Sequence, residues 1–411
     1  MASMLSGIRV LDLTRILAGP WATQMLADLG AEVIKIEKPG EGDDTRHLGP
    51  PFIHDAHTGA QADAAYFLVA NRAKESVAID ISTAGGQELI LALAAKCDVL
   101  VENYKVGGLK KYGLDYEALH QRFPNLIYCS VTGFGQTGPY RQRAGYDFLI
   151  QGMGGLMSVT GEADGKPGGG PQRAGVALAD VISGMYAATG ILAALRHRDQ
   201  GGGGQHIDIG MLDVQVAVLA NQSMNYLVSG VVPRRIGNGH PSVVPYQAFP
   251  ASDGHVIFAV GNDGQFARMS RAMGRPDLAT DARFATNANR VANRGVLIPL
   301  LEELTRSRSI EEWVSIMEGA DVPCGPINTI DRVFENPQVQ ARGMRMDLPH
   351  PVAGTVPSVA NPIRFSETPI TYKGAPPLLG EHTAEALHRI LGLDAQAIEN
   401  LRKNHIIGDL P

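Results

Sequence analysis

The sequence predicts an α/β fold, with an open, Rossmann-like parallel sheet in a large domain and a second, smaller α+β domain. The first observation is that short apolar, strand-like runs alternate with helix-like runs through the first third of the chain, which is typical of βαβ units. The second is size, since 411 residues, 44% of them hydrophobic, can form more than one core.

The alternation can be followed from the N-terminus. Strands are expected over residues 8–13, 33–36, 98–101 and 126–131. Helices are expected over residues 20–29, 86–96 and 116–123. Pro20 near the first position and Gly30 just past the end mark the bounds of the first helix. Residues 49–64 interrupt this order and are expected to be an irregular insertion.

The pattern changes after residue 200. Residues 201–204 are expected to be a connector, His206–Ile209 a strand, and Asp213–Val228 one long helix. Asp253-Gly254 lies between two strand-like runs and predicts a hairpin over residues 246–260. Helices follow over 277–313, a turn at 323–326 and a last helix at 383–391.

These elements predict the domain organisation. We expect a large domain over residues 1–200, a linker over 201–225 and a small domain over 226–325. Residues 326–411 are expected to form a second long linker and a C-terminal part that returns to the large domain.

Charge and cysteine content exclude several classes of protein. The formal net charge is −6, and no basic tract is present, which argues against a nucleic-acid or membrane partner. The three cysteines, Cys97, Cys129 and Cys324, are far apart and have no metal-ligand spacing. No signal peptide is visible, and no apolar run reaches membrane-spanning length. We therefore expect a cytoplasmic protein without a metal.

The common nucleotide and hydrolase motifs are missing. The segment after the first expected strand, Leu13–Pro20, lacks the GxGxxG pattern that cradles a dinucleotide pyrophosphate. No GxSxG, P-loop or HExxH pattern occurs either. This disfavours an NAD-dependent dehydrogenase.

A single carboxylate, Asp180, stands out in the segment Gly175–Leu195 because a helix-like run follows it directly. One interpretation is a helix N-cap, in which Asp180 accepts the free amide of Ser183. The other is a nucleophilic carboxylate that the helix start keeps ionised. The small residues Gly175, Ala177 and Gly184 would then leave room for a bulky substrate.

Basic residues gather near the expected strand ends. They are Arg15, Lys38, Arg46, Arg72, Lys74, Lys110 and Lys111. Ligands of an open α/β sheet bind at the carboxyl ends of its strands, so these side chains would suit a polyphosphate ligand. Taken singly, each is more often a solvated surface charge.

Several long segments resemble the family III CoA-transferases. They lie at residues 5–46, 71–76, 101–113, 130–155, 175–195, 245–266, 322–330 and 376–383. The resemblance thus covers nearly the whole chain in order. GDDTR at 42–46, RAGYD at 143–147 and VPYQAF at 244–249 narrow it to the succinyl-CoA-dependent dicarboxylate transferases.

The resemblance implies that Asp180 is the nucleophile that forms an acyl-aspartyl anhydride and then an aspartyl-CoA thioester. Coenzyme A is then a substrate, and no metal is required. The implied CoA-binding residues are Arg15, Ile16, Leu17, Ala18, Lys38, Arg72, Lys74, Ile79, Ile81, Asn103, Tyr104 and Lys111. Among them, Ile16–Ala18 match the loop along the pantetheine and thioester, and Ile79 and Ile81 match positions around the adenine.

The remaining implied residues concern the acyl group and the acceptor acid. Tyr146 matches a tyrosine near the reacting acyl group, and Gly261–Gln265 matches a mobile loop over the active aspartate. Arg46, Arg72 and Arg143 are candidates for the distal carboxylate of a dicarboxylate, such as glutarate or hydroxymethylglutarate. Each could equally be a CoA-phosphate contact or a structural ion pair. The resemblance also implies an interlocked homodimer.

Two alternatives remain at the level of the sequence. An α-methylacyl-CoA racemase would share the fold, but it would carry a histidine where this chain has Tyr146. A non-catalytic CoA-binding protein would have no reason to keep Asp180 in its full motif.

Overall fold

The computed structural model describes residues 3–408 and separates into two compact units. Unit 1 comprises residues 1–156, 174–223 and 338–411, and unit 2 comprises residues 157–173 and 224–337. The glycine-rich segment 157–173 therefore belongs with the smaller unit, whereas the sequence placed it in the large domain. The second crossing between units falls near residue 337 rather than residue 325.

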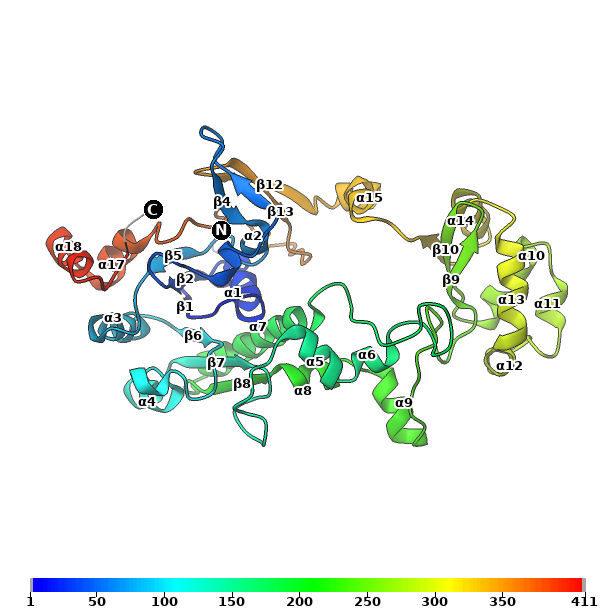
Figure 1. Cartoon of the computed structure of the whole chain (residues 1–411), viewed down its shortest axis with the longest axis horizontal. Helices are drawn as coiled ribbons and strands as arrows, with labels where there is room; N and C mark the ends of the chain where they lie inside the picture. Colours follow the sequence, from blue (N-terminus) through cyan, green and yellow to red (C-terminus); the bar gives the residue numbers. More distant parts are fainter. Residues whose placement is uncertain (1–2, 409–411) are drawn as a thin grey trace. The chain divides into compact units, whose positions relative to one another are not determined.

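Unit 1 is built on a six-stranded sheet in which every neighbouring pair is parallel (Figure 1). The strands are β1 (Arg9–Asp12), β2 (Glu32–Glu37), β5 (Glu75–Ala78), β6 (Val99–Glu102), β7 (Ile127–Thr132) and β8 (His206–Gly210). Their order is β5-β2-β1-β6-β7-β8. The chain winds outward from β1 in one direction and from β6 in the other, which creates a topological switch point between these two strands.

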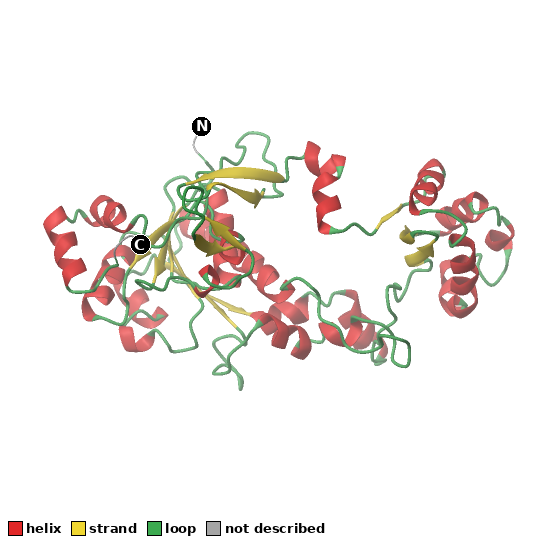
Figure 2. Cartoon of the chain, turned by 45° about the horizontal axis from the view of Figure 1, so that its top comes forward, coloured by secondary structure: helices red, strands yellow, loops and turns green. Residues whose placement is uncertain are grey.

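Successive residues of the strands point to opposite faces of the sheet and so pack into two separate cores. Val10 of β1 packs into the core that contains α1 (Ala18–Asp28) and α7 (Leu178–Asp199), and the next residue, Leu11, packs into the opposite core. A side-chain period of two explains this division. The second core lies under α3 (Ala84–Ala94), α4 (Tyr116–Arg122), α17 (Thr383–Leu391) and α18 (Ala395–Lys403). Helices therefore cover both faces of the sheet (Figure 2).

The expected strands and helices of the first third are confirmed, but the insertion at 49–64 is more regular than expected. It forms a hairpin from β3 (Phe52–His54) and β4 (Gln61–Ala64), followed by α2 (Ala65–Leu68). A second hairpin, β12 (Arg345–His350) and β13 (Gly354–Val359), lies in the C-terminal part. Its Leu348 and Val356 share a small apolar cluster with Leu68.

The remaining elements of unit 1 are short. They are η1 (Asp44–Arg46), η2 (Lys110–Tyr112), α5 (Asp147–Met153), α8 (Met211–Ala217) and α16 (Pro337–Ala341), while α6 (Leu156–Val159) lies at the boundary with unit 2. The single helix expected over 213–228 is wrong. Ala220 adopts a left-handed backbone conformation, with φ of 47°, and separates α8 from α9 (Asn221–Ser229).

Unit 2 contains an antiparallel sheet in the order β11-β10-β9. The hairpin of β9 (Tyr246–Ala251) and β10 (Gly254–Ala259) is confirmed, whereas Cys324–Pro326 forms strand β11 rather than a turn. Phe249, Phe258 and Trp313 form the aromatic centre of its core. The helices are α10 (Asp263–Ala272), α11 (Asp277–Thr280), α12 (Asn287–Ala292), α13 (Arg294–Thr305), α14 (Ile310–Gly319) and α15 (Ile330–Glu335).

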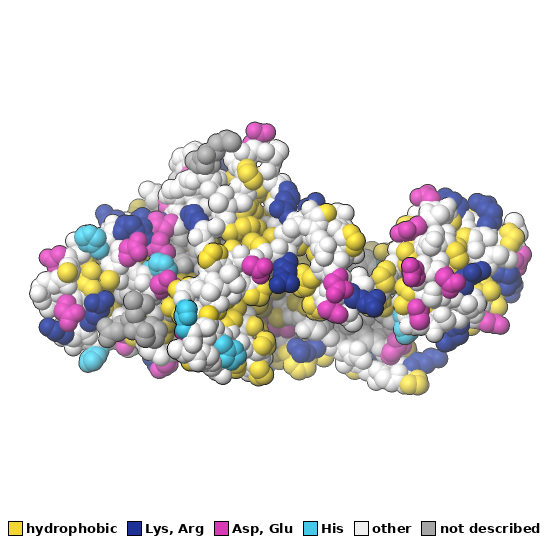
Figure 3. All heavy atoms as spheres, turned by 90° about the horizontal axis from the view of Figure 1, so that it is seen from above, with side chains coloured by type: hydrophobic (Ala, Val, Ile, Leu, Met, Phe, Trp, Pro, Cys, Tyr) yellow, Lys and Arg dark blue, Asp and Glu magenta, His cyan; other side chains and the backbone are white. Residues whose placement is uncertain are grey.

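The long helix α7 is a core element. Its length and composition pass a simple test for a membrane-spanning helix, the one such segment among residues 3–408. Yet Ala187, Ile191 and Ala194 of α7 are buried in the core shared with α1 and the sheet. On the face shown in Figure 3, Lys and Arg are interspersed with Asp and Glu, with no extended region of one sign.

Candidate active site

Asp180 lies in the first turn of α7, but it is not the N-cap. The helix begins at Leu178, and Ala177 is the cap residue, so Asp180 is the third helical residue. The amide of Val181 already bonds the carbonyl of Ala177 at 3.0 Å. The N-cap interpretation of Asp180 is therefore wrong, because the helix starts three residues earlier than the sequence indicated.

The start of α7 is capped by a different carboxylate, Asp147, at the N-terminus of α5. The amide of Ala179 donates to Asp147 Oδ1 at 2.9 Å. Gln151, one turn further along α5, donates through Nε2 to Asp147 Oδ2 at 2.8 Å and accepts from the amide of Ala174 through Oε1 at 2.9 Å. This brace fixes the backbone on the N-terminal side of Asp180.

The environment of Asp180 favours the neutral acid. Burial raises the pKa of Asp180 to about 7, and the nearby charge of Asp147 acts in the same direction. The helix start was expected to keep this group ionised, whereas burial and Asp147 work against ionisation. Tyr66 of α2 lies near both carboxylates. Burial raises the pKa of Tyr66, and the charges of Asp180 and Asp147 raise it further.

Asp180 opens into a cavity of about 490 Å³. Among the residues that line it are Ile16 and Leu17 from the loop between β1 and α1, which we call the β1–α1 loop, and Ala18, the first residue of α1. The cations Arg15, Lys105, Lys111, Arg141 and Arg143 also line it. A carboxylate, a helix start and several cations therefore face one space, which suits an anionic substrate that reacts at Asp180.

Side chains at the ends of neighbouring strands hold the β1–α1 loop. Asn103, just after β6, accepts from the amide of Arg15 at 2.9 Å and donates to its carbonyl at 2.7 Å. Asp12 accepts from both the amide and the hydroxyl of Thr14 at 2.9 and 2.5 Å. The loop therefore sits at the switch point between β1 and β6, where ligands of such sheets bind.

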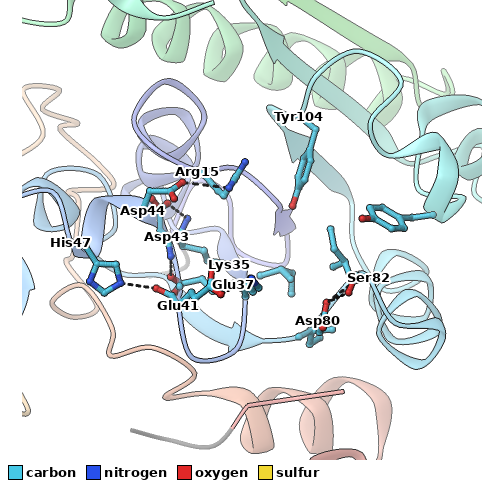
Figure 4. Close-up of a pocket in the computed structure, with 16 residues that line it drawn as sticks. Arg15, Lys35, Glu37, Glu41, Asp43, Asp44, His47, Asp80, Ser82 and Tyr104 are labelled. Atoms are coloured by element: carbon cyan, nitrogen blue, oxygen red, sulfur yellow. Dashed lines mark hydrogen bonds and ion pairs between the residues drawn. The ribbon is translucent and has the colours of Figure 1, made fainter. Parts of the chain in front are cut away.

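A second cavity, of about 430 Å³, shares Arg15, Tyr104 and Tyr112 with the first (Figure 4). Ile79 and Ile81 supply apolar walls. Its exposed cations are already paired, Lys38 with Glu41 at 2.5 Å and Arg15 with Asp44 at 3.4 Å. The two cavities thus adjoin and form one continuous candidate site. Apolar and charged side chains line the second cavity, and the carboxylate of Asp180 lies in the first.

Comparisons with known proteins agree with this geometry. The model of "CoA-transferase family III" matches residues 5–383. The chain is 50% identical to the succinate–glutarate CoA-transferase of Agrobacterium fabrum over 393 residues, covering 96% of this chain and 97% of that protein. This protein belongs to CoA-transferase family III. It is an α/β enzyme of this family, and CoA thioesters are the substrates of such transferases.

A second relative and a crystal structure support the same family assignment. This transferase is 43% identical to the human succinyl-CoA:glutarate CoA-transferase, over 97% of this chain and 88% of that protein. A crystal structure of a CaiB/BaiF family protein from Brucella suis has a TM-score of 0.84 and 50% identity, and it covers 95% of this chain and all of its own. The fold class expected from the sequence is therefore confirmed.

The structure brings most of the expected CoA-binding side chains of this transferase to the two cavities. Ile16, Leu17, Ala18, Asn103 and Lys111 line the cavity of Asp180, together with Tyr146 and Arg143. Lys38, Ile79 and Ile81 line the second cavity, and Arg15 and Tyr104 line both. Among residues 3–408, no cluster of three or more His, Cys, Asp or Glu side chains could hold a metal ion.

Three expected site cations lie elsewhere, in buried ion pairs. Arg46 pairs with Glu37 at 2.7 Å and with Asp63 at 2.8 Å. Arg72 pairs with Asp28 at 2.5 Å and also donates to the carbonyl of Val359 at 2.9 Å.

Lys74, the third, is fully buried against Asp12, at 3.0 Å, and donates to the carbonyl of Pro20 at 3.0 Å. These partners satisfy the donors of all three cations, because a buried charge needs a counter-ion, and none of the three lines either cavity.

Gly261–Gln265 leads into helix α10 of unit 2. Asn262 caps helix α10 by accepting from the amide of Gln265 at 2.9 Å, and Gln265 in turn accepts from the amide of Gly261 at 2.7 Å. That this segment is mobile and covers the aspartate stays a prediction. One expectation about glycines is corrected: Gly184 makes no room for substrate, because a Cβ there would lie 2.5 Å from the carbonyl oxygen of Ala18. Its role is the close packing of α7 on α1.

The sequence analysis gave no role to several groups near Asp180, Lys105 among them. Asp147 stood in the quoted RAGYD motif but received no role, because its contact with Ala179 spans 32 positions. Tyr66 lies just after the segment expected to be irregular. Arg141 lies two positions from Arg143, and both are exposed and line the cavity.

Proposed function

We propose that this protein transfers coenzyme A from succinyl-CoA to a free dicarboxylic acid, with glutarate or hydroxymethylglutarate as the model acceptors. The observation that carries the proposal is the placement of Asp180 in one cavity with the backbone of Ile16–Ala18 and with cationic side chains. The names of the similar transferases support the choice of donor and acceptor.

The proposed chemistry uses the Asp180 carboxylate as an acyl acceptor. One carboxylate oxygen attacks the thioester carbonyl, the carbon–sulfur bond breaks, and a mixed anhydride and CoA thiolate form. The thiolate then attacks the Asp180 carbonyl of the anhydride, which releases succinate and leaves an aspartyl-CoA thioester. The acceptor carboxylate repeats the two steps in reverse and restores Asp180. No net proton is gained or lost.

We assign the CoA moiety to the two adjoining cavities. Ile79 and Ile81 provide an apolar surface for the adenine, and Lys38 and Arg15 provide charges for the phosphates. The pantetheine would run past Asn103 and Tyr104 toward Asp180. Helix α1 begins at Ala18, and the amides of Ala18 and Gly19 in its first turn have no intrahelical acceptor, so they are available to a developing oxyanion.

For the distal carboxylate of the acceptor we propose Arg143. Of the three arginines expected from the sequence, Arg46 and Arg72 are committed to buried ion pairs, whereas Arg143 is exposed and lines the cavity of Asp180. Its guanidinium lies over the ring of Tyr140, 4.6 Å from the centroid, which orients a planar group that can bind a carboxylate through two bonds. Tyr146 lies in the same cavity, near the expected position of the acyl group.

We also propose an interlocked homodimer in the cytoplasm. Leu227, Val228, Val231 and Val232 are each at least 67% exposed. A run of apolar side chains on the surface is typical of a segment that a partner covers. Light scattering after gel filtration would give the mass of a dimer, twice 43.8 kDa, whereas a monomer mass would contradict this part of the proposal.

The transfer is tested by incubating the protein with succinyl-CoA and a panel of free mono- and dicarboxylic acids. Mass spectrometry of the CoA esters identifies the acids that accept CoA. Asp180→Ala and Asp180→Asn should abolish the transfer, while near-unchanged folding shows that the loss is chemical. If no acid accepts CoA, or if both variants transfer as the parent does, the proposal fails. Loss of chirality of a 2-methylacyl-CoA without transfer would instead indicate racemase chemistry.

A further inference from the structure

The β1–α1 loop contains an unusual backbone conformation at Ile16. Its φ is 70°, in the left-handed region that non-glycine residues seldom adopt and β-branched residues adopt least. Ile16 lines the cavity of Asp180 beside Leu17 and Ala18. Such a conformation persists only where surrounding interactions hold it, so specific groups must hold Ile16 in place.

The direct contact is Asp43. The amide of Ile16 donates to Asp43 Oδ1 at 3.2 Å. The other oxygen of this carboxylate, Oδ2, pairs with the ammonium of Lys35 at 2.8 Å, and both side chains are completely buried. Lys35 donates further to the carbonyl of Thr14 at 2.9 Å. The buried Lys35–Asp43 ion pair is therefore hydrogen-bonded to the loop on both sides of Arg15, at Thr14 and at Ile16.

Asp43 is itself firmly placed. It caps the short helix η1 by accepting from the amide of Thr45 at 3.0 Å, and its own amide donates to Glu37 Oε2 at 2.8 Å. Burial alone would raise the pKa of Asp43, but the Lys35 ammonium and the hydrogen bonds from Thr45 lower it to about 2, so the carboxylate stays ionised. It also lines the second cavity, as Figure 4 shows, while Ile16 lines the first.

We propose that Asp43 is a positioning residue, which holds Ile16 in its left-handed conformation and thereby keeps residues 16–18 arranged for the thioester before substrate binds. Asp43 need not touch the substrate for this. The proposal rests on the proposed transferase function, since it concerns the geometry of the same site. A preorganised backbone matters because amides aimed at the developing oxyanion must not move during the reaction.

The test uses two donor thioesters, succinyl-CoA and succinyl-pantetheine, which lacks the nucleotide. In Asp43→Asn the shape remains but the charge that fixes the group to Lys35 is lost. We expect kcat to fall about 10- to 100-fold with both donors, as for other small misplacements of reacting groups, while the KM for succinyl-CoA changes less than about threefold. A loss confined to the KM of succinyl-CoA would show a CoA contact instead and would overturn the proposal.

A rescue variant separates positioning from general damage. Glycine adopts a φ of 70° without strain, so Ile16→Gly added to Asp43→Asn should recover kcat by about fivefold or more over Asp43→Asn alone. Ile16→Ala added in its place shortens the side chain but relieves only part of the strain, so it should recover clearly less kcat than Ile16→Gly. Equal activity of the two double variants would contradict the proposal.

Folding and activity are monitored separately. If Asp43→Asn does not fold because Lys35 is left unpaired, Lys35→Gln/Asp43→Asn removes both buried charges, and the glycine and alanine comparison is repeated on it. Hydrogen exchange of residues 13–18 gives a readout without turnover, and protection should fall in Asp43→Asn. If the parent transfers no CoA but this protection still falls, the function is wrong and the positioning role stands; unchanged protection overturns the positioning role itself.

Discussion

The carboxylate of Asp147 accepts a hydrogen bond from the amide of Ala179, the residue immediately before Asp180, at 2.9 Å. Asp147 thus performs two tasks. It caps helix α7 in place of a residue of that helix, and its negative charge lies close enough to raise the pKa of Asp180. A nucleophilic carboxylate with a pKa near the working pH is less solvated and more reactive than one in water, but part of it is neutral at pH 7.

Asp147→Asn should shift the pH dependence of the reaction. The asparagine side chain keeps an oxygen for the amide of Ala179 but removes the charge that opposes ionisation of Asp180. We expect the acid limb of kcat/KM to move about one pH unit lower, because a like charge is lost from the surroundings of the nucleophile. Gln151→Ala is the control, since it disturbs the brace without changing charge. An acid limb that stays in place in Asp147→Asn would show that the Asp147 charge is unimportant.

The raised pKa of Asp180 also predicts a pH-dependent stability. The pKa is about 7 in the folded protein and ordinarily 3.8, so the folded protein holds a proton that the unfolded chain releases. The contribution of the Asp180 proton to the free energy of unfolding is fully present below about pH 4 and is lost as pH rises through 7. Asp180→Asn removes that decline. Its free energy of unfolding should match the parent near pH 4 and exceed it at pH 8 by on the order of 2 kcal/mol after allowance for solvent screening.

Urea unfolding of the parent and Asp180→Asn at pH 4.5, 6 and 8 measures this difference. A difference in the free energy of unfolding between the two proteins that grows with pH supports a buried, proton-binding Asp180. A constant gap would mean that Asp180 ionises in the fold much as it does in the unfolded chain.

The sequence predicted the central sheet because short apolar, strand-like runs, such as the one that contains Val10 and Leu11, alternate with helix-like runs, and the apolar character of each run is visible locally. It could not predict the start of α7. No capping side chain precedes Leu178, and the cap comes from Asp147, which only the packing of α5 on α7 brings there.

The misassigned cations have a similar explanation. Arg46 and Arg143 are both arginines in motifs that carry the family resemblance, and nothing local distinguishes them. Arg46 is buried because Glu37, nine residues earlier, and Asp63 both lie within reach once β2 and the β3–β4 hairpin are folded. Arg143 has aromatic neighbours and stays exposed in the cavity.

Arg143→Ala should affect dicarboxylate acceptors selectively. The variant loses the guanidinium proposed to bind the distal carboxylate, so the KM for glutarate should rise about tenfold or more, as expected for loss of a charge-assisted bond. The KM for a monocarboxylate of the same length, such as valerate, should change little. Arg141→Ala, another exposed cation of the same cavity, is the matched control. Equal effects of Arg143→Ala on both acids would remove Arg143 from the acceptor site.

Arg46→Ala should act on stability rather than on substrate affinity. Removal of the guanidinium leaves the carboxylate of Glu37 buried and unpaired, which we expect to cost about 3 kcal/mol in the free energy of unfolding. Asp63 also loses its partner, but its side chain is 16% exposed and can be solvated. The Arg46 side chain additionally loses its contact with the ring of Phe67, whose centroid lies 3.7 Å from the guanidinium carbon.

Thermal and urea unfolding of Arg46→Ala, beside steady-state kinetics of the folded fraction, distinguish the two roles. The melting temperature should fall by several degrees, while the KM values for succinyl-CoA and glutarate stay within about twofold, because Arg46 lines neither cavity. Arg275→Ala breaks an exposed pair with Asp277 and should leave the melting temperature nearly unchanged. A stable Arg46→Ala protein with a selective rise in the KM for glutarate would place Arg46 at the substrate after all, since only direct contact with the acid would produce that combination.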